Sequence, residues 1–262
     1  MEANEEAQEV EKTYLYGMDF LTHFGKYLLM LKGMFSKTDS GAMFWKEYIK
    51  QCVDIGIGSL PIVIIISFFL GAVMTVQTAA QLVNPMVPLS TIGIIVRDGM
   101  ILEFAPTFLS IVLAGVVGSK IASELGNMRV TEQIDALEIM GINTKSYLIL
   151  PKILASFTMV PLMVGISAVI GIWGGYLVGG WTNAVPNEVF IDGIRKSLDY
   201  NYINIAFYKS FIFAFIISTV PSYFGYYVKG GALEIGKAGT LSVVVSCIII
   251  LIADYLVASI AI

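Results

Sequence analysis

Charged residues are scarce in this chain, and their scarcity excludes an ordinary soluble domain. They make up 14% of the 262 residues, against about 25% in typical soluble domains. Hydrophobic residues make up 56%, and the mean hydropathy is +0.79. This composition indicates an integral membrane protein. The net charge of −4 is weak and gives no sign of nucleic-acid binding.

Histidine and cysteine are also scarce, which removes most catalytic and metal-site chemistry. His23 is the one histidine, so a histidine-based metal site or a catalytic triad has almost nothing to use. Cys52 and Cys247 lie beside or within apolar runs and imply no disulfide framework. We expect a non-catalytic chain with no metal and no cofactor.

One segment comes close to a phosphate-binding loop. Residues 231–238 read Gly-Ala-Leu-Glu-Ile-Gly-Lys-Ala, and Ala238 stands where the motif needs Ser or Thr to ligate magnesium. The segment also lies between two apolar runs rather than after a strand. It is therefore interpreted as a glycine-rich cytoplasmic turn.

Long gaps between charged residues predict five membrane spans, since a helix needs roughly 20 apolar residues to cross a bilayer. The spans are expected at about 56–81, 99–123, 148–178, 206–228 and 239–260. The predicted organisation is a disordered acidic segment over 1–12, interfacial or elbow helices over 13–50, and a transmembrane domain over 51–262. The expected fold class is an all-α polytopic membrane protein.

Two further segments have apolar residues but are not expected to span. From Tyr14 to Phe35, helical spacing joins Phe20, Phe24, Leu28, Leu31 and Phe35. The charges between them indicate an amphipathic helix lying in the membrane interface. Behind a turn at residues 84–88, Leu89–Val96 is expected to be a short interfacial or re-entrant piece.

The distribution of Lys and Arg predicts the orientation. With the N-terminus in the cytoplasm, twelve of the sixteen cations fall on the cytoplasmic side. Five spans then place the C-terminus outside. In the third span, Gly171, Gly175 and Gly179 recur every four residues, and this stripe of small residues predicts close packing against another helix.

The loop over residues 126–141, between the second and third spans, has the pattern of a short cytoplasmic helix. Thr131 is expected to cap its N-terminus, with Glu132 and Asp135 near the positive end of its dipole. Gly141 is placed to end it.

This short helix has two distinct rows of side chains. The apolar row is Ile134, Leu137 and Met140, and the acidic row is Glu132, Asp135 and Glu138. Because so short a helix is marginal alone, either the protein's own cytoplasmic face or a partner must hold it. An apolar ridge edged with acids fits a groove edged with bases.

Two acidic residues, Glu103 and Asp254, fall inside predicted spans. Charge at membrane depth is costly, so such side chains usually face protein or a watery cavity. For Glu103 a functional and a structural role stay open, whereas for Asp254 the structural role is favoured.

Several motifs together resemble the MCE-associated ABC permeases of the MlaE type. They are Phe44-Trp45, Glu103-Phe-Ala-Pro106, Ala114-Gly115-Val-Val-Gly118-Ser119, Glu124-Leu-Gly126, Thr131-Glu-Gln-Ile-Asp-Ala-Leu137, Met140-Gly141, Pro151, Gly171-Ile-Trp173-Gly-Gly175 and the segment from Gly236 to Asp254. The resemblance covers about four fifths of the chain.

This resemblance implies a lipid-transporting membrane subunit in the inner membrane. A second copy of the chain would complete the core, a cytoplasmic ABC ATPase dimer would hydrolyse ATP, and a ring of MCE-domain proteins would sit in the periplasm. The coupling-helix positions are Thr131, Glu132, Ile134, Asp135, Leu137, Glu138, Met140 and Gly141. A lipid cavity lined by the first, second and fifth spans would contact Val73, Met74, Gln77 and Glu103.

The chain departs from the family pattern beside Glu103. Leu102 replaces the usual Arg, Ala105 replaces a Gly, and Val116 replaces a second Arg. A headgroup contact made by the first Arg therefore does not transfer, and Arg97 and Lys120 are the nearby candidates to replace it.

Two rival functions stay open from the sequence. One is a proton-coupled secondary transporter that titrates Glu103 and Asp254, although no internal repeat supports it. The other is a membrane scaffold that transports nothing. Dependence on a separate ATPase would discriminate the permease from both.

Overall fold

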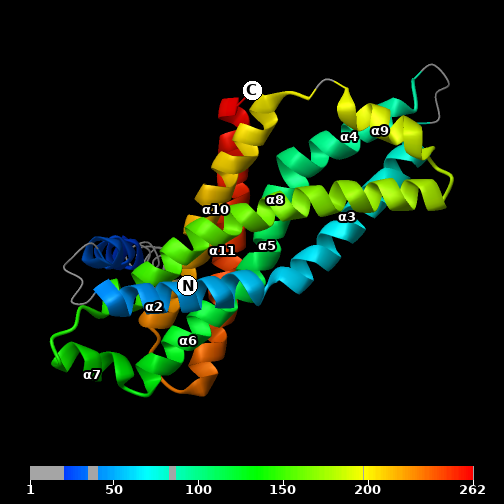
Figure 1. Cartoon of the computed structure of the whole chain (residues 1–262). Helices are drawn as coiled ribbons and strands as arrows, with labels where there is room; N and C mark the ends of the chain where they lie inside the picture. Colours follow the sequence, from blue (N-terminus) through cyan, green and yellow to red (C-terminus); the bar gives the residue numbers. More distant parts are fainter. Residues whose placement is uncertain (1–20, 35–40, 83–86, 197, 262) are drawn as a thin grey trace, which may run out of the picture.

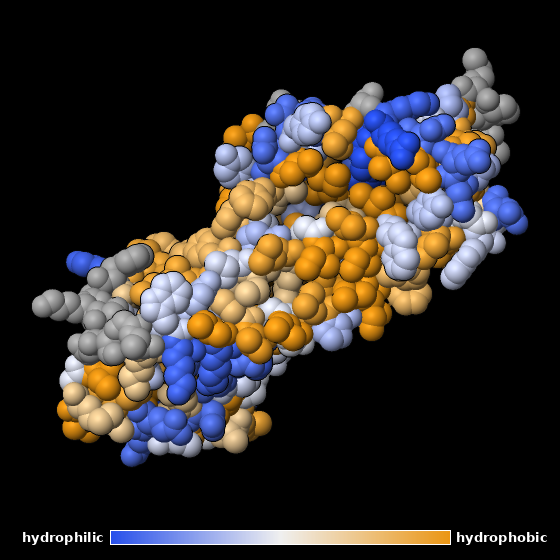
Figure 2. All heavy atoms as spheres, viewed as in Figure 1, coloured by the Kyte–Doolittle hydropathy of each residue, from blue (hydrophilic) through white to orange (hydrophobic). Residues whose placement is uncertain are grey.

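The computed structural model describes residues 21–34, 41–82, 87–196 and 198–261, which are helical apart from short turns. Five helical stretches are long and apolar enough to cross a membrane: Met43–Gln81, Ser90–Val130, Lys145–Trp181, Tyr200–Tyr226 and Ala232–Ile260. On the face seen in Figure 2, apolar residues cover most of the middle of the molecule, and hydrophilic residues gather towards its two ends. The prediction of an all-α protein with five spans is confirmed, and each span is longer than the charge gaps indicated.

The first two spans combine α-helix with π-helical segments. The first contains α2 (Gly41–Cys52), the π-helical η1 (Val53–Ile57) and α3 (Leu60–Gln81). The second contains α4 (Ser90–Gly99), η2 (Met100–Phe108), α5 (Leu109–Leu113), η3 (Ala114–Gly118) and α6 (Ser119–Val130). The short piece predicted over Leu89–Val96 is part of this second stretch, because the helix starting at Ser90 runs into η2 without a break.

The second half of the chain contains two short helices between the long ones. It runs through α7 (Gln133–Ile139), η4 (Lys145–Ile149), α8 (Leu150–Trp181), α9 (Asn187–Arg195), α10 (Tyr200–Tyr226) and α11 (Ala232–Ala261). Helix α7 lies at one end of the molecule and the C-terminal end of α11 at the other (Figure 1). The phosphate-loop-like segment is helical from Ala232 onward, and no strand occurs in the described ranges.

Helix α9 was not among the expected elements, and it packs on the start of the second span. Phe190 is 1% exposed in a small apolar core with Ile92, Val96 and Met100. The backbones of α4 and α9 come close, since a Cβ on Gly93 would lie 3.2 Å from the Gly193 Cα. Helix α9 is short and buries a single aromatic side chain, so it does not stand out as an apolar stretch in the sequence.

The first and third spans pack through small residues, as the glycine stripe predicts. A Cβ on Gly71 of α3 would overlap the carbonyl oxygen of Gly171 in α8. Gly175 and Gly179 both face Thr75, whose hydroxyl donates to the Gly71 carbonyl at 2.9 Å. Helices α3 and α8 therefore lie side by side with their backbones in contact (Figure 1).

The helix over residues 21–34 attaches to α10 by one face. Met30 and Met34 are buried, and the Tyr27 hydroxyl donates to Thr219 at 2.8 Å. Burial raises the pKa of that Tyr27 hydroxyl. The opposite face exposes the apolar side chains of Leu21, Phe24, Leu28 and Leu29. The predictions for residues 1–12, Phe20 and Phe35 lie outside the described residues.

We expect Gly71→Ala to separate the first and third spans, because the new methyl group would overlap backbone that cannot move as a side chain does. Overpacking of this kind costs about 3 kcal/mol or more. Gly165→Ala in α8 is the matched control, since nothing lies within 4 Å of its Cβ position. Thermal unfolding in detergent measures both, and equal midpoints would contradict the packing described.

Candidate functional site

Pro106 changes the backbone hydrogen bonding of the second span within η2. A proline has no N–H, so it donates no backbone hydrogen bond within this π-helical segment. In the same segment, the ammonium of Lys209 in α10 donates to the Leu102 carbonyl at 3.2 Å. A side chain from another span therefore supplies a hydrogen-bond donor to the backbone of η2.

The same ammonium holds both intramembrane carboxylates. Lys209 Nζ lies 2.9 Å from Glu103 Oε1 and 2.7 Å from Asp254 Oδ1. The Thr107 hydroxyl donates to Asp254 at 2.8 Å and lies 3.4 Å from Glu103 Oε2. This polar cluster of Glu103, Thr107, Lys209 and Asp254 joins the second, fourth and fifth spans.

The members of the polar cluster differ sharply in exposure. The side chain of Lys209 is 1% exposed and that of Asp254 18%, whereas that of Glu103 is 49% exposed. The buried ammonium needs its partners, because an unpaired charge at this depth is strongly unfavourable. The open side of the cluster is therefore a carboxylate, and the cation lies behind it.

Neither cation suggested by the sequence takes the place of the family Arg. Arg97 is buried and donates to the carbonyls of Ile194 and Lys196, at 2.7 and 2.5 Å, near the end of α9. Lys120 pairs with Asp54 at 3.1 Å. The cation at Glu103 is Lys209, which sequence reasoning counted only as an outer-side charge. The sequence held one signal for this pairing: two acids, Glu103 and Asp254, lie at membrane depth and had no cation assigned to them.

The predicted lipid-contacting residues of α3 divide between two faces. Val73 is 59% exposed and Gln77 is also exposed. Met74 is half-buried and packs on the small apolar core around Phe190. It also contacts Gly99, which lies one turn before Glu103. Val73, Gln77 and Glu103 are therefore open to the surroundings, whereas Met74 supports the backbone that carries Glu103.

Helix α7 begins later than predicted. The Thr131 hydroxyl donates to the Asn127 carbonyl at 2.8 Å, so Thr131 ends α6 instead of capping α7. The reason is that α6 continues to Val130, which leaves Thr131 in its last turn. Glu132 occupies the N-cap position with φ 60° and makes no side-chain cap. Gly141, at φ +81°, ends the helix as predicted.

Helix α7 is fastened to its own protein by much of both predicted rows. Ile134 is fully buried, and Asp135 pairs with Arg129 of α6 at 2.6 Å. Glu138 accepts hydrogen bonds from Tyr226 at 2.8 Å and from Thr144 at 3.1 Å. Of the two alternatives left open by the sequence, the protein's own surface therefore holds α7, and Ile134 is not available to a partner.

The exposed apolar surface of α7 is at its C-terminal end. Ile139 is 87% exposed and Met140 66%, whereas Leu137 is half-buried. Of the acidic row, Glu132 alone has a side chain that forms no hydrogen bond or ion pair with any described residue. Among the described residues, no three His, Cys, Asp or Glu side chains gather as metal ligands would.

Comparison with known proteins gives one consistent result. The family described as Permease MlaE matches residues 48–260. A probable ABC transporter permease protein of Rickettsia bellii is 35% identical, covering 89% of this chain and 90% of its own. A probable ABC transporter permease protein of Synechocystis is 30% identical, with 80% of each chain covered. The chloroplastic protein trigalactosyldiacylglycerol 1 of Arabidopsis thaliana is 31% identical, covering 84% and 62%.

We expect Lys209→Met to lower the free energy of unfolding by about 2 kcal/mol, because it leaves two carboxylates without their shared cation. Adding Asp254→Asn should restore part of that loss. Lys237→Met is the control, since Lys237 forms a solvent-exposed pair with Glu234. Thermal unfolding in detergent is the measurement, and an equal effect of Lys209→Met and Lys237→Met would refute a structural role for the cluster.

Proposed function

The chain belongs to the MlaE family of ABC transporter permeases, and on this premise we propose that it forms the membrane part of a lipid transporter. The observation that carries the proposal is Glu103, a half-exposed carboxylate fixed by a buried cation beside the exposed apolar face of α3. Such a site offers a polar contact to a headgroup and an apolar wall to acyl chains. The Arabidopsis relative is named after a lipid, trigalactosyldiacylglycerol, and this name also supports lipid as the cargo.

A second copy of this chain would enclose the cavity. The fifth span supports this arrangement, because only 11% of its most apolar stretch is buried within one chain. Asp254 on this span already reaches Lys209 and Thr107. Joining two copies along the first, second and fifth spans would place two Glu103 carboxylates around one space.

We place α7 in the cytoplasm, the C-terminus in the periplasm and the chain in the inner membrane. A ring of MCE-domain proteins would meet the periplasmic end. The surplus of cations near α7 supports this orientation, since cytoplasmic segments attract Lys and Arg. It holds even though Arg97, Lys152 and Lys209 are buried and do not act as loop charges.

A cytoplasmic ABC ATPase would dock on the exposed end of α7 and hydrolyse the ATP. Ile139 and Met140 supply the apolar contact there, and Glu132 supplies the free acidic group. Movement of α7 would pass to α10 through the hydrogen bond between Glu138 and Tyr226. Membership of an ABC permease family and the ion-paired state of both acids argue against proton-coupled transport.

Replacing both Ile139 and Met140 by Glu should abolish co-purification of the ATPase without reducing the yield of the membrane chain, because both side chains already face solvent. Ile139→Val with Met140→Leu is the matched control and should keep the ATPase. Quantitative mass spectrometry of the tagged complex measures the ratio of the two subunits. A normal ratio in the Glu variant would rule out this docking surface.

Glu103→Gln should change the lipids that co-purify with the complex, because it removes the charge that the site presents while keeping its shape. We expect a loss of at least half of the bound lipid, or a shift in headgroup class, in lipid mass spectrometry. Glu188→Gln, on the exposed surface of α9, is the control. An unchanged lipid profile for Glu103→Gln would contradict a lipid contact at this residue.

A further inference from the structure

A groove separates the first and second spans near the end of the molecule that carries α7. One wall is η1 with the start of α3, and the other is η3 with α6. The groove holds about 80 Å³, the space of several water molecules. Both walls include π-helical backbone, which recurs at functional sites. Its polar lining includes Asp54, Ser59, Lys120 and Glu124.

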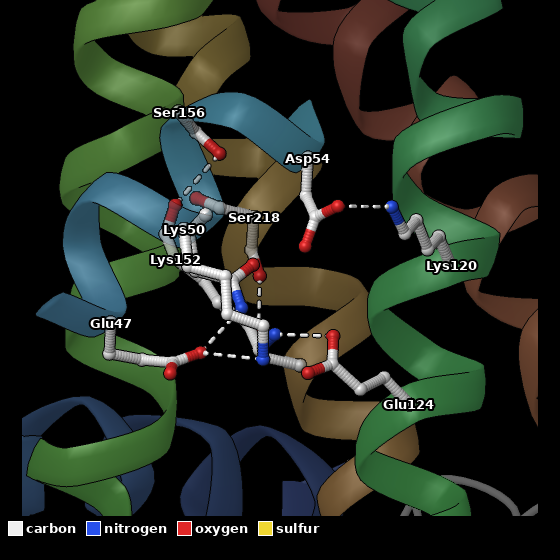
Figure 3. Close-up of polar contacts among 10 residues, drawn as sticks. Glu47, Lys50, Asp54, Lys120, Glu124, Lys152, Ser156 and Ser218 are labelled. Carbon is white, nitrogen blue, oxygen red and sulfur yellow. Dashed lines mark hydrogen bonds and ion pairs between the residues drawn. The ribbon is translucent and has the colours of Figure 1, made fainter. Parts of the chain in front are cut away.

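The charges of this groove form two ion pairs of very different accessibility. Glu124 pairs with Lys152 at 2.6 Å, and the Lys152 side chain is 3% exposed. Lys120 pairs with Asp54 at 3.1 Å across the groove, with side chains 54% and 39% exposed. Both pairs start from one face of α6 (Figure 3). The first pair is largely buried, while the second is exposed to solvent and weak, so its contacts can be exchanged for contacts with a ligand.

Ser59 adds a hydroxyl to the lining of the groove, at the N-cap position of α3. This hydroxyl makes no cap hydrogen bond and bonds to no other group in the described ranges. It is therefore available to donate a hydrogen bond to a molecule in the groove.

We propose that the groove binds the headgroup of a zwitterionic phospholipid carrying a phosphate and a primary amine. The phosphate would take Lys120 and Ser59, and the amine would take the carboxylate of Asp54 that Lys120 gives up. A simple anion would leave that carboxylate unpaired next to a second negative charge, whereas a zwitterion keeps every charge matched. The apolar side chains of Val116 and Val117 would border its acyl chains.

This site lies in the opposite half of the spans from Glu103. Lys120 and Glu124 are within the last three turns of α6 before α7, where headgroups of the cytoplasmic leaflet lie if α7 is cytoplasmic. The inference rests on that proposed orientation and not on the proposed cargo. Binding can be measured without ATPase or transport, so failure of one proposal does not imply failure of the other.

The test is native mass spectrometry of the full chain, delipidated in detergent and titrated with short-chain phosphatidylethanolamine or phosphatidylglycerol. Lys120→Gln should weaken binding of both lipids by about tenfold, the effect of losing one charge-assisted hydrogen bond. Asp54→Asn should weaken phosphatidylethanolamine alone, because phosphatidylglycerol has no amine. Lys237→Gln, which breaks the exposed pair with Glu234, should change neither.

A further variant separates loss of lipid binding from loss of the fold, which the charge substitutions alone could not distinguish. Val116→Phe fills the groove from its partly exposed side and keeps both ion pairs, so it should also weaken both lipids while unfolding at the wild-type temperature. Wild-type affinity in Lys120→Gln and Val116→Phe would overturn the proposal. So would equal losses in Lys120→Gln and Lys237→Gln. Inorganic phosphate and phosphoethanolamine are titrated in parallel, and binding as tight as the lipid's would assign the groove to a soluble phosphate compound instead.

Discussion

Hydrocarbon offers no hydrogen-bond partner, and this constraint explains most of the polar contacts in the chain. Each break in regular helical bonding must be satisfied from within the protein. The second span is π-helical around Pro106, and Lys209 donates to the Leu102 carbonyl in this segment. Because a buried ammonium needs negative charge, Glu103 and Asp254 lie beside it. The lysine and the two acids thus satisfy one another, and the exposed side of Glu103 remains available to a ligand.

Helices α6 and α10 both contact α7 and extend from it into the spans. Helix α10 carries Tyr226, which holds α7 through Glu138, and also Lys209 in the polar cluster. Tyr226 follows Lys209 by seventeen positions, which corresponds to about 25 Å of continuous helix at 1.5 Å per residue. Helix α6 carries Arg129 against α7 and Glu124 against the third span. A displacement of α7 therefore acts directly on both helices. Through α10 and Lys209, it also reaches the half-exposed Glu103.

Composition and charge spacing predicted the fold well because a membrane span has few alternatives. The glycine stripe over residues 171–179 also identified a real contact, since small residues every four positions leave one face of a helix open. The caps and contacts of α7 were harder to predict. Thr131 fits the N-cap pattern equally well as the last residue of α6, and periodicity cannot tell which side of a two-turn helix faces its own protein.

Only the two acids of the polar cluster could be predicted from the sequence. Glu103 and Asp254 stood out as acids inside apolar runs. Lys209, by contrast, borders the uncharged stretch that predicted the fourth span, so it looked like an ordinary charge at the end of a span. Pairing them requires knowing that the second, fourth and fifth spans meet. The groove with Lys120 and Ser59 was equally hidden, because its walls come from segments that are far apart in sequence and individually unremarkable.

We propose that ATP hydrolysis by a separate subunit moves lipid through a cavity at Glu103. Reconstitution of the complex with its co-purified ATPase, in liposomes that contain headgroup-labelled phospholipid, tests this directly. We expect redistribution of the label with ATP, none with a non-hydrolysable analogue, and a strong reduction in the Glu103→Gln complex. Redistribution that follows a proton gradient and ignores ATP would contradict it.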